Sequence, residues 1–139
     1  MFRRILFAHN GQPVAEKAIP YLEHLARADG AEVIVLHVYQ PPALYTASGG
    51  YQQLLDSWEA LAQEVVDDTV THLREGGFEA RGVVKAGEPA SVILEVAREE
   101  DVSLIVLGAR GPSSVKELLI GDVSTEVLRR TRRPVLLVP

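Results

Sequence analysis

Four short segments of the chain are continuously apolar and rich in β-branched residues or leucine: residues 5–8, 33–38, 104–107 and 135–138. Such runs are typical of strands buried on both faces, as in a parallel sheet covered by helices on each side. A fifth run, near residues 78–84, has a less regular pattern and lies between Gly76-Gly77 and Gly87. We expect it at an edge of the sheet.

The segments between these runs have apolar residues at helical spacing. Pro13 suits the first position of a helix that continues to Gly30, and Pro20 should kink that helix because it cannot donate to the Glu16 carbonyl. A third helix begins at Pro89 and a fourth spans about 123–130. The alternation of strands and helices predicts right-handed βαβ units and a doubly wound five-stranded parallel sheet in one α/β domain, residues 1–139. The residues on the expected inward face of the second helix are Leu54, Trp58, Leu61, Val65, Thr69 and Leu73.

Composition and charge narrow the classes of function. Of the 139 residues, 47% are hydrophobic and 24% charged, which is ordinary for a globular domain. The net charge of −5 makes non-specific binding to nucleic acid or to a membrane surface a poor fit. The basic run of Arg129, Arg130, Arg132 and Arg133 would complement the dipole at the end of the fourth helix.

The sequence contains no cysteine, which excludes disulfides, thiol catalysis and thiolate metal sites. No run approaches the roughly 20 apolar residues of a membrane helix, and the first apolar run is too short for a signal peptide. We therefore expect a cytosolic protein. The longest irregular segment, residues 39–50, is either a flexible loop or a lid over a site at the sheet edge.

In a doubly wound sheet, ligands bind outside the carboxyl ends of the strands, where the strand order reverses. Two segments should meet there, residues 8–12 after the first strand and residues 108–124 after the fourth. Gly108, Gly111 and Gly121 would allow sharp turns and close approach of the backbone to a ligand. Because Gly121 precedes a helix, free N–H groups there could bind an anion, although the glycines could equally serve the turns alone.

The spacing Gly108, two residues, Gly111, nine residues, Gly121 resembles the universal stress protein family. Further resemblance lies in residues 5–8, Leu36-His37-Val38, the stretch from Gly87 to Ala90, residues 104–111, residues 121–124 and the C-terminal residues 133–138. It implies a Rossmann-like sandwich of the adenine-nucleotide alpha-hydrolase type and a homodimer that pairs through Val135–Val138. Some members of the family bind ATP and others do not, so ATP, with Mg²⁺ or Mn²⁺, could be a ligand of this chain.

In those members the glycines and the start of the fourth helix face the phosphates and ribose, and the ends of the first two strands surround the adenine and ribose. Arg110 could clamp a phosphate or a partner's carboxylate, and His9 could contact the nucleotide or be a polar rim residue. The positions that the resemblance implies are Ala8, His9, Asn10, Val38, Leu107, Gly108, Arg110, Gly111, Gly121, Asp122, Val123 and Ser124.

Three positions depart from the ATP-binding pattern: Asn10 replaces Asp, Gln12 replaces Ser, and Asp122 replaces Ser or Thr. Asp122 can be an N-cap that takes up the helix N–H groups and repels a phosphate. It can also be a ligand for Mg²⁺ or Mn²⁺ that bridges to phosphate oxygens, or a cap that swings aside. Asn10 keeps an acceptor for a ribose hydroxyl but lacks the charge.

These observations favour a dimeric stress protein that binds an adenine nucleotide and does not catalyse. An alternative is a module without nucleotide, closed by Asp122, which acts through unknown protein partners. A slow nucleotide hydrolase is a third hypothesis, but no nucleophile is paired with a base in the sequence pattern.

Overall fold

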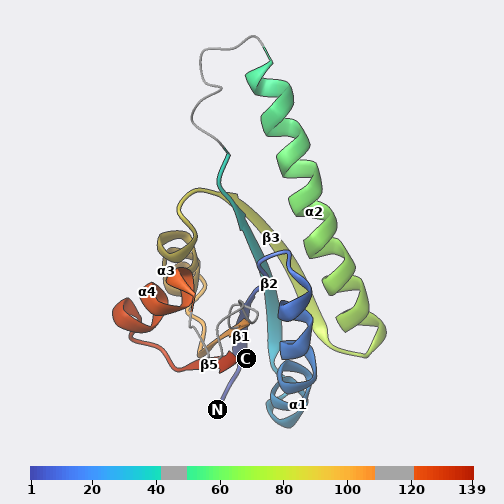
Figure 1. Cartoon of the computed structure of the whole chain (residues 1–139). Helices are drawn as coiled ribbons and strands as arrows, with labels where there is room; N and C mark the ends of the chain where they lie inside the picture. Colours follow the sequence, from blue (N-terminus) through green and yellow to red (C-terminus); the bar gives the residue numbers. More distant parts are fainter. Residues whose placement is uncertain (42–49, 109–120) are drawn as a thin grey trace.

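The computed structural model describes residues 1–41, 50–108 and 121–139. Five parallel strands form one sheet in the order β3-β2-β1-β4-β5 (Figure 1). This confirms the predicted doubly wound sheet, including the edge position of the third strand. The strands are β1 (Arg4–Ala8), β2 (Glu32–Tyr39), β3 (Glu79–Ala86), β4 (Leu104–Gly108) and β5 (Val135–Val138).

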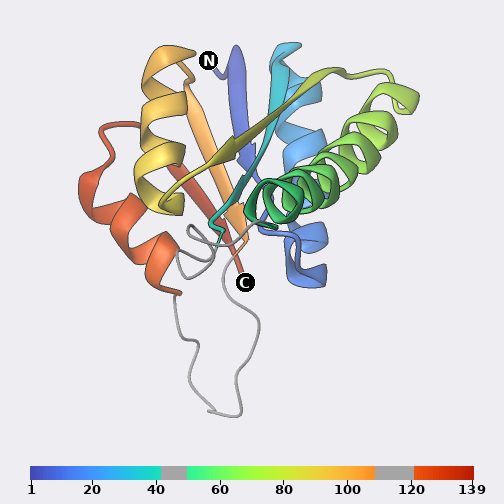
Figure 2. The ribbon, with the colours of Figure 1, turned by 90° about the horizontal axis from the view of Figure 1, so that it is seen from above.

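Helices cover both faces of the sheet (Figure 2). Alternate residues of β1 face opposite ways, so Ile5 and Phe7 pack against the α1 and α2 layer while Leu6 packs against α3. Every one of these three side chains is fully buried. The helices are η1 (Pro13–Ala18, a 3-10 helix), α1 (Ile19–Asp29), α2 (Tyr51–Glu75), α3 (Pro89–Glu99) and α4 (Asp122–Arg130).

The strand order reverses between β1 and β4. After β1 the chain continues through η1 and α1 on one face, and after β4 it reaches α4 on the other face. The two neighbouring strands therefore send their connections to opposite sides, which leaves a crevice at their carboxyl ends. The site is built in this crevice.

Pro20 does not kink a continuous helix, as the sequence predicts, but lies in the first turn of a new one. The 3-10 helix η1 ends at Ala18, and the N–H of Ile19 still bonds to the Glu16 carbonyl. Pro20 has no N–H to donate, and the first turn of an α-helix needs none. The chain thus restarts as α1 at Ile19 instead of bending.

The buried face of α2 agrees only in part with the predicted one. Thr69 and Leu73 are buried as predicted, but Leu61 is 64% exposed, and the buried positions begin at Ala62. The reason is a close contact with β3, where a Cβ on Gly82 would lie 2.1 Å from Val66 Cγ1. This approach turns Val66 toward the sheet. The buried residues of α2 are Ala62, Val66, Thr69, Val70 and Leu73.

The described parts of the chain contain no helix that is long and apolar enough to cross a membrane. Most of the irregular segment predicted at 39–50 lies outside the described residues, since β2 runs to Tyr39 and the description resumes at Gly50.

Candidate functional site

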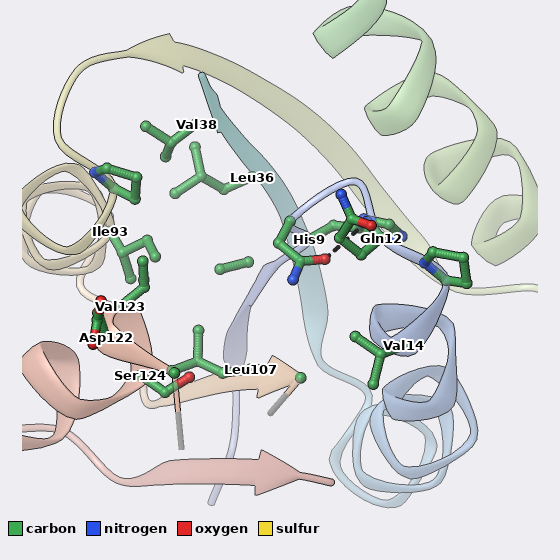
Figure 3. Close-up of a pocket in the computed structure, with 16 residues that line it drawn as sticks. His9, Gln12, Val14, Leu36, Val38, Ile93, Leu107, Asp122, Val123 and Ser124 are labelled. Atoms are coloured by element: carbon green, nitrogen blue, oxygen red, sulfur yellow. Dashed lines mark hydrogen bonds between the residues drawn. The ribbon is translucent and has the colours of Figure 1, made fainter. Parts of the chain in front are cut away.

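A cavity of about 780 Å³ opens at the carboxyl ends of β1 and β4 (Figure 3). Its walls come from the β1–η1 turn, the ends of β2 and β4, and the first residues of α3 and α4. This volume lies within the range of small-molecule and cofactor sites, which is roughly 300–1,000 Å³. One side is apolar, with Leu36, Val38, Ile93 and Leu107, while the start of α4 supplies polar groups.

Ten of the twelve residues proposed from the sequence line this one cavity. The other two, Arg110 and Gly111, lie outside the described residues. The fold therefore brings together segments that are about a hundred positions apart in the chain. The ten are Ala8, His9, Asn10, Val38, Leu107, Gly108, Gly121, Asp122, Val123 and Ser124.

The sequence reasoning missed several residues of the wall. Pro89 and Ile93 enter because α3 begins at the same edge of the sheet as α4. A helix start after an edge strand was visible in the sequence, and it could have suggested this placement. The residues that the sequence analysis did not propose are Pro13, Val14, Leu36, Pro89 and Ile93, while Gln12 belongs to the segment 8–12 that was expected at the site.

His9 is buried, with 5% of its surface exposed, and both of its ring nitrogens have protein partners. The Gly11 N–H donates to Nδ1 at 2.9 Å, so the proton of the neutral ring lies on Nε2, which donates to Glu16 Oε1 at 2.7 Å. The His9 carbonyl accepts from His37 Nδ1 at 2.7 Å. His9 therefore holds the shape of the turn, and its ring is not a polar rim residue.

The turn after β1 brings its backbone very close to β2. Gly11 has φ +80°, and a Cβ there would lie 3.3 Å from His37 Cε1. Asn10 Oδ1 accepts from the Gln12 N–H at 2.9 Å, which is a second hydrogen bond within the turn besides that of the Gly11 N–H with His9 Nδ1. Asn10 lines the cavity and has a neutral amide, with a donor group, where an aspartate would have a carboxylate.

The prediction that Asp122 caps α4 is wrong. Gly121 is the N-cap, with φ −64° and ψ 163°, and its carbonyl accepts from the Thr125 N–H at 2.9 Å. An extended conformation of this kind is usual for an N-cap, so the helix begins one residue earlier than predicted and Asp122 becomes its first residue. The Asp122 side chain is exposed and caps no N–H group.

Ser124 supplies a second polar group at the start of α4. It is 5% exposed, and among the described residues its hydroxyl has no hydrogen-bond partner. The first N–H groups of a helix also lack partners within the helix and carry its positive dipole end. Together these groups form a donor-rich corner of the cavity beside Val123, which suits an anion.

The other helix start at the cavity is closed by its own carboxylate. Glu88, the N-cap of α3, accepts from the Ala90 N–H at 3.2 Å and the Ser91 N–H at 2.7 Å. Hydrogen bonding by Ser91 is the main cause that lowers the pKa of Glu88 below its ordinary value, and Arg130 also contributes. An anion would therefore find donors at α4 and not at α3.

A divalent cation has one carboxylate available in this cavity, that of Asp122, within the residues the structure describes. No group of three or more His, Asp or Glu side chains gathers anywhere in the described ranges. The donor set therefore fits a cation that is held mainly by phosphate oxygens and not by a protein cage.

A doubly wound parallel sheet with a cavity at its switch point defines an α/β domain of the Rossmann-like class. All of residues 1–139 match the family model of the universal stress protein family, and the chain belongs to this family. Universal stress protein YxiE of Bacillus subtilis is 32% identical over 147 residues, covering 99% of each chain. The structure of MJ0577 of Methanocaldococcus jannaschii matches with a TM-score of 0.87 at 26% identity, covering 99% of this chain and 96% of that one.

Two further solved structures share this fold and contain ligands. One is a universal stress protein in complex with cAMP, with a TM-score of 0.64 at 22% identity, covering 99% of this chain and 97% of that one. The other is the universal stress protein from Archaeoglobus fulgidus in complex with dAMP, with a TM-score of 0.71 at 24% identity, covering 100% of this chain and 98% of that one. At these identities the likeness concerns the fold alone.

Proposed function

We propose that this universal stress protein binds an adenine nucleotide in the cavity, with its phosphates at the start of α4. The observation that carries the proposal is the open N-terminus of α4 beside Ser124, whose hydroxyl lines the cavity and has no hydrogen-bond partner among the described residues. The apolar side of the cavity, with Leu36 and Val38, offers a surface for the base. AMP and ATP are the first ligands to test, and cAMP and dAMP occur in proteins of the same fold.

This proposal has two forms, which differ in whether a divalent cation at Asp122 accompanies the nucleotide. A nucleotide without metal would face the carboxylate as a like charge, so it would bind weakly. With Mg²⁺ or Mn²⁺, Asp122 could share the cation with phosphate oxygens, and the charge would then favour binding. The exposed position of Asp122 allows either arrangement.

The proposed role is binding and not catalysis. The support for this is that His9, the buried imidazole in the cavity wall, has both ring nitrogens engaged by Gly11 and Glu16. A histidine fixed in this way has no free nitrogen to take a proton from a substrate.

A homodimer through β5 is also part of the proposal. β5 is the outer strand of the sheet next to β4, so one row of its backbone groups has no partner strand among the described residues. Sedimentation velocity over a range of concentrations tests this, with a monomer at micromolar concentration as the contrary result. A cytosolic location stays a prediction, which imaging of a tagged chain would test.

The experiment for nucleotide binding is mass spectrometry of ligand released from freshly purified protein, beside the Asp122→Ser variant. Release of an adenine nucleotide from the natural chain would support the proposal. An empty natural chain beside a loaded variant would mean that Asp122 keeps nucleotides out, and the chain would then act through protein partners. No ligand in either form, with no heat on titration of Mg-ATP or AMP at millimolar concentration, would refute nucleotide binding.

A further inference from the structure

A second groove, of about 420 Å³, lies between α3 and the end of α4, apart from the nucleotide-type cavity. Four arginines border it, and we name it the arginine groove. We propose that the arginine groove binds a short acidic segment of a partner protein. Its lining residues are Ser91, Leu94, Glu95, Ala97, Arg98, Arg130, Thr131, Arg132 and Arg133.

The arginine groove has a charge opposite to that of the rest of the chain. It contains four arginines and one glutamate, Glu95. Removing these from the 14 basic and 19 acidic side chains of the sequence leaves 10 basic and 18 acidic residues elsewhere. An anionic partner is therefore attracted to this groove and repelled by most of the remaining surface.

Two of the four arginines are held in place by the protein. Arg133 donates through Nε to the Val102 carbonyl at 2.8 Å, and its Nη2 lies 3.4 Å from Asp101 Oδ1. Arg130 donates through Nη1 to Ser91 Oγ at 3.3 Å, which links the end of α4 to the start of α3. Both side chains thus reach toward α3 and its C-terminal connection, in addition to any effect on the dipole of α4.

The other two arginines, Arg98 and Arg132, are exposed. Within the described ranges neither has an ion pair or a side-chain hydrogen bond. Their charges are therefore available to a partner, and a guanidinium pairs with a carboxylate through two parallel hydrogen bonds. Two fixed and two free guanidinium groups on one groove favour a ligand with more than one carboxylate.

The size and floor of the groove favour a peptide segment over other anions. From Ser91 to Arg98 the wall formed by α3 spans about 10 Å, at 1.5 Å per residue. Leu94 and Ala97 make part of the floor apolar, which suits one apolar side chain between acidic ones. A long nucleic acid would extend beyond the groove onto the acidic remainder of the surface, where its phosphates would be repelled.

The experiment uses a fluorescein-labelled peptide Asp-Glu-Leu-Glu-Asp, its neutral counterpart Asn-Gln-Leu-Gln-Asn, and inorganic phosphate as a competitor. Fluorescence anisotropy gives the affinity at low salt and at about 150 mM salt, where screening weakens exposed ion pairs. The test variant is Arg98→Gln with Arg132→Gln, whose side chains have no partners to lose in the described part of the chain. The matched control, Arg3→Gln with Lys85→Gln, removes the same charge at two exposed side chains outside the groove.

We expect saturable binding of the acidic peptide alone, weakened roughly fivefold or more in the test variant and less than twofold in the control. Amide shifts in the NMR spectrum should then map to residues 91–98 and 130–133. Equal weakening in both double variants would overturn the proposal, because it would show only non-specific attraction. Displacement of the peptide by equimolar phosphate, or no saturation at millimolar peptide, would overturn it as well.

Discussion

Substitution of Asp122 by asparagine tests whether the proposed nucleotide places its phosphate at the first residue of α4. The change keeps the size of the side chain and removes one negative charge. Two like charges about 4 Å apart repel by ~1 kcal/mol in water and by ~4 kcal/mol at an effective dielectric constant of about 20. Because Asp122 is exposed, the lower figure applies, and it corresponds to about fivefold in affinity.

The assay is isothermal titration calorimetry with AMP in the presence of EDTA. We expect Asp122→Asn to bind AMP about fivefold more tightly than the natural chain, and the difference should shrink as salt is added. Adenosine, which has no phosphate, should bind equally to both forms. Glu126→Gln is the matched control, since Glu126 is on the same helix but outside the cavity and pairs with Arg129 at 3.2 Å.

Two results would refute the reasoning. An unchanged AMP affinity would place the phosphate away from α4, and an equal gain for adenosine would show that the effect is not electrostatic. The same titration with ATP and Mg²⁺ distinguishes the metal role. If Asp122→Asn binds Mg-ATP more weakly than the natural chain, Asp122 is a ligand of the cation.

Three other substitutions test the scaffold around the site. Gly82→Ala should cost about 1–3 kcal/mol of stability because Val66 must move, which calorimetry would show as a lower Tm, and adding Val66→Ala should recover part of the loss. Glu88→Gln should lower the free energy of unfolding by about 1 kcal/mol at pH 7. Folding lowers the Glu88 pKa from its ordinary value of 4.5, so the natural chain loses this advantage as the pH falls through the lowered value. Urea unfolding of both forms over a range of pH measures the difference. His9→Ala should cost about 2–4 kcal/mol in the same assay, whereas Glu16→Gln, at a side chain 58% exposed, should cost less than about 1 kcal/mol; equal costs would contradict the assigned network.

The strands could be predicted almost to the residue because each is an apolar run bounded by polar or turn residues. β5 begins and ends where the pattern places it, at Val135–Val138, and β1 differs by one residue. β3 was placed at the edge correctly, but its bounds moved to Glu79–Ala86. An edge strand covered on one side by α2 has a mixed pattern, so its ends are poorly marked in the sequence.

The helices were harder to predict in detail because tertiary contacts decide them. Leu61 fits a helical stripe by spacing, yet it is 64% exposed, while Val66, which lies outside that stripe, packs close to Gly82. The kink expected at Pro20 became a boundary between η1 and α1 because starting a new helix satisfies the backbone without a bend. Neither the contact of Val66 with Gly82 nor the boundary between η1 and α1 can be deduced from one segment of sequence alone.

The candidate site followed from the topology and from the resemblance, but its polar details did not. The buried bonds of His9 depend on Glu16, which is seven residues away on the other side of the Gly11 turn. Gly121 took the cap position that Asp122 was expected to fill. These outcomes depend on side-chain geometry within a few ångströms, which a pattern of residue types does not contain.

Helix α3 forms part of the wall of both the nucleotide-type cavity and the arginine groove. Pro89 and Ile93 line the nucleotide-type cavity, while Leu94 and Arg98 line the arginine groove, and Arg130 bonds across to Ser91. A partner that prefers one position of this helix would change the affinity of a nucleotide by the same factor as the nucleotide changes that of the partner. Because α3 lines both recesses, the affinity of the arginine groove for its partner would then depend on whether the nucleotide-type cavity is occupied.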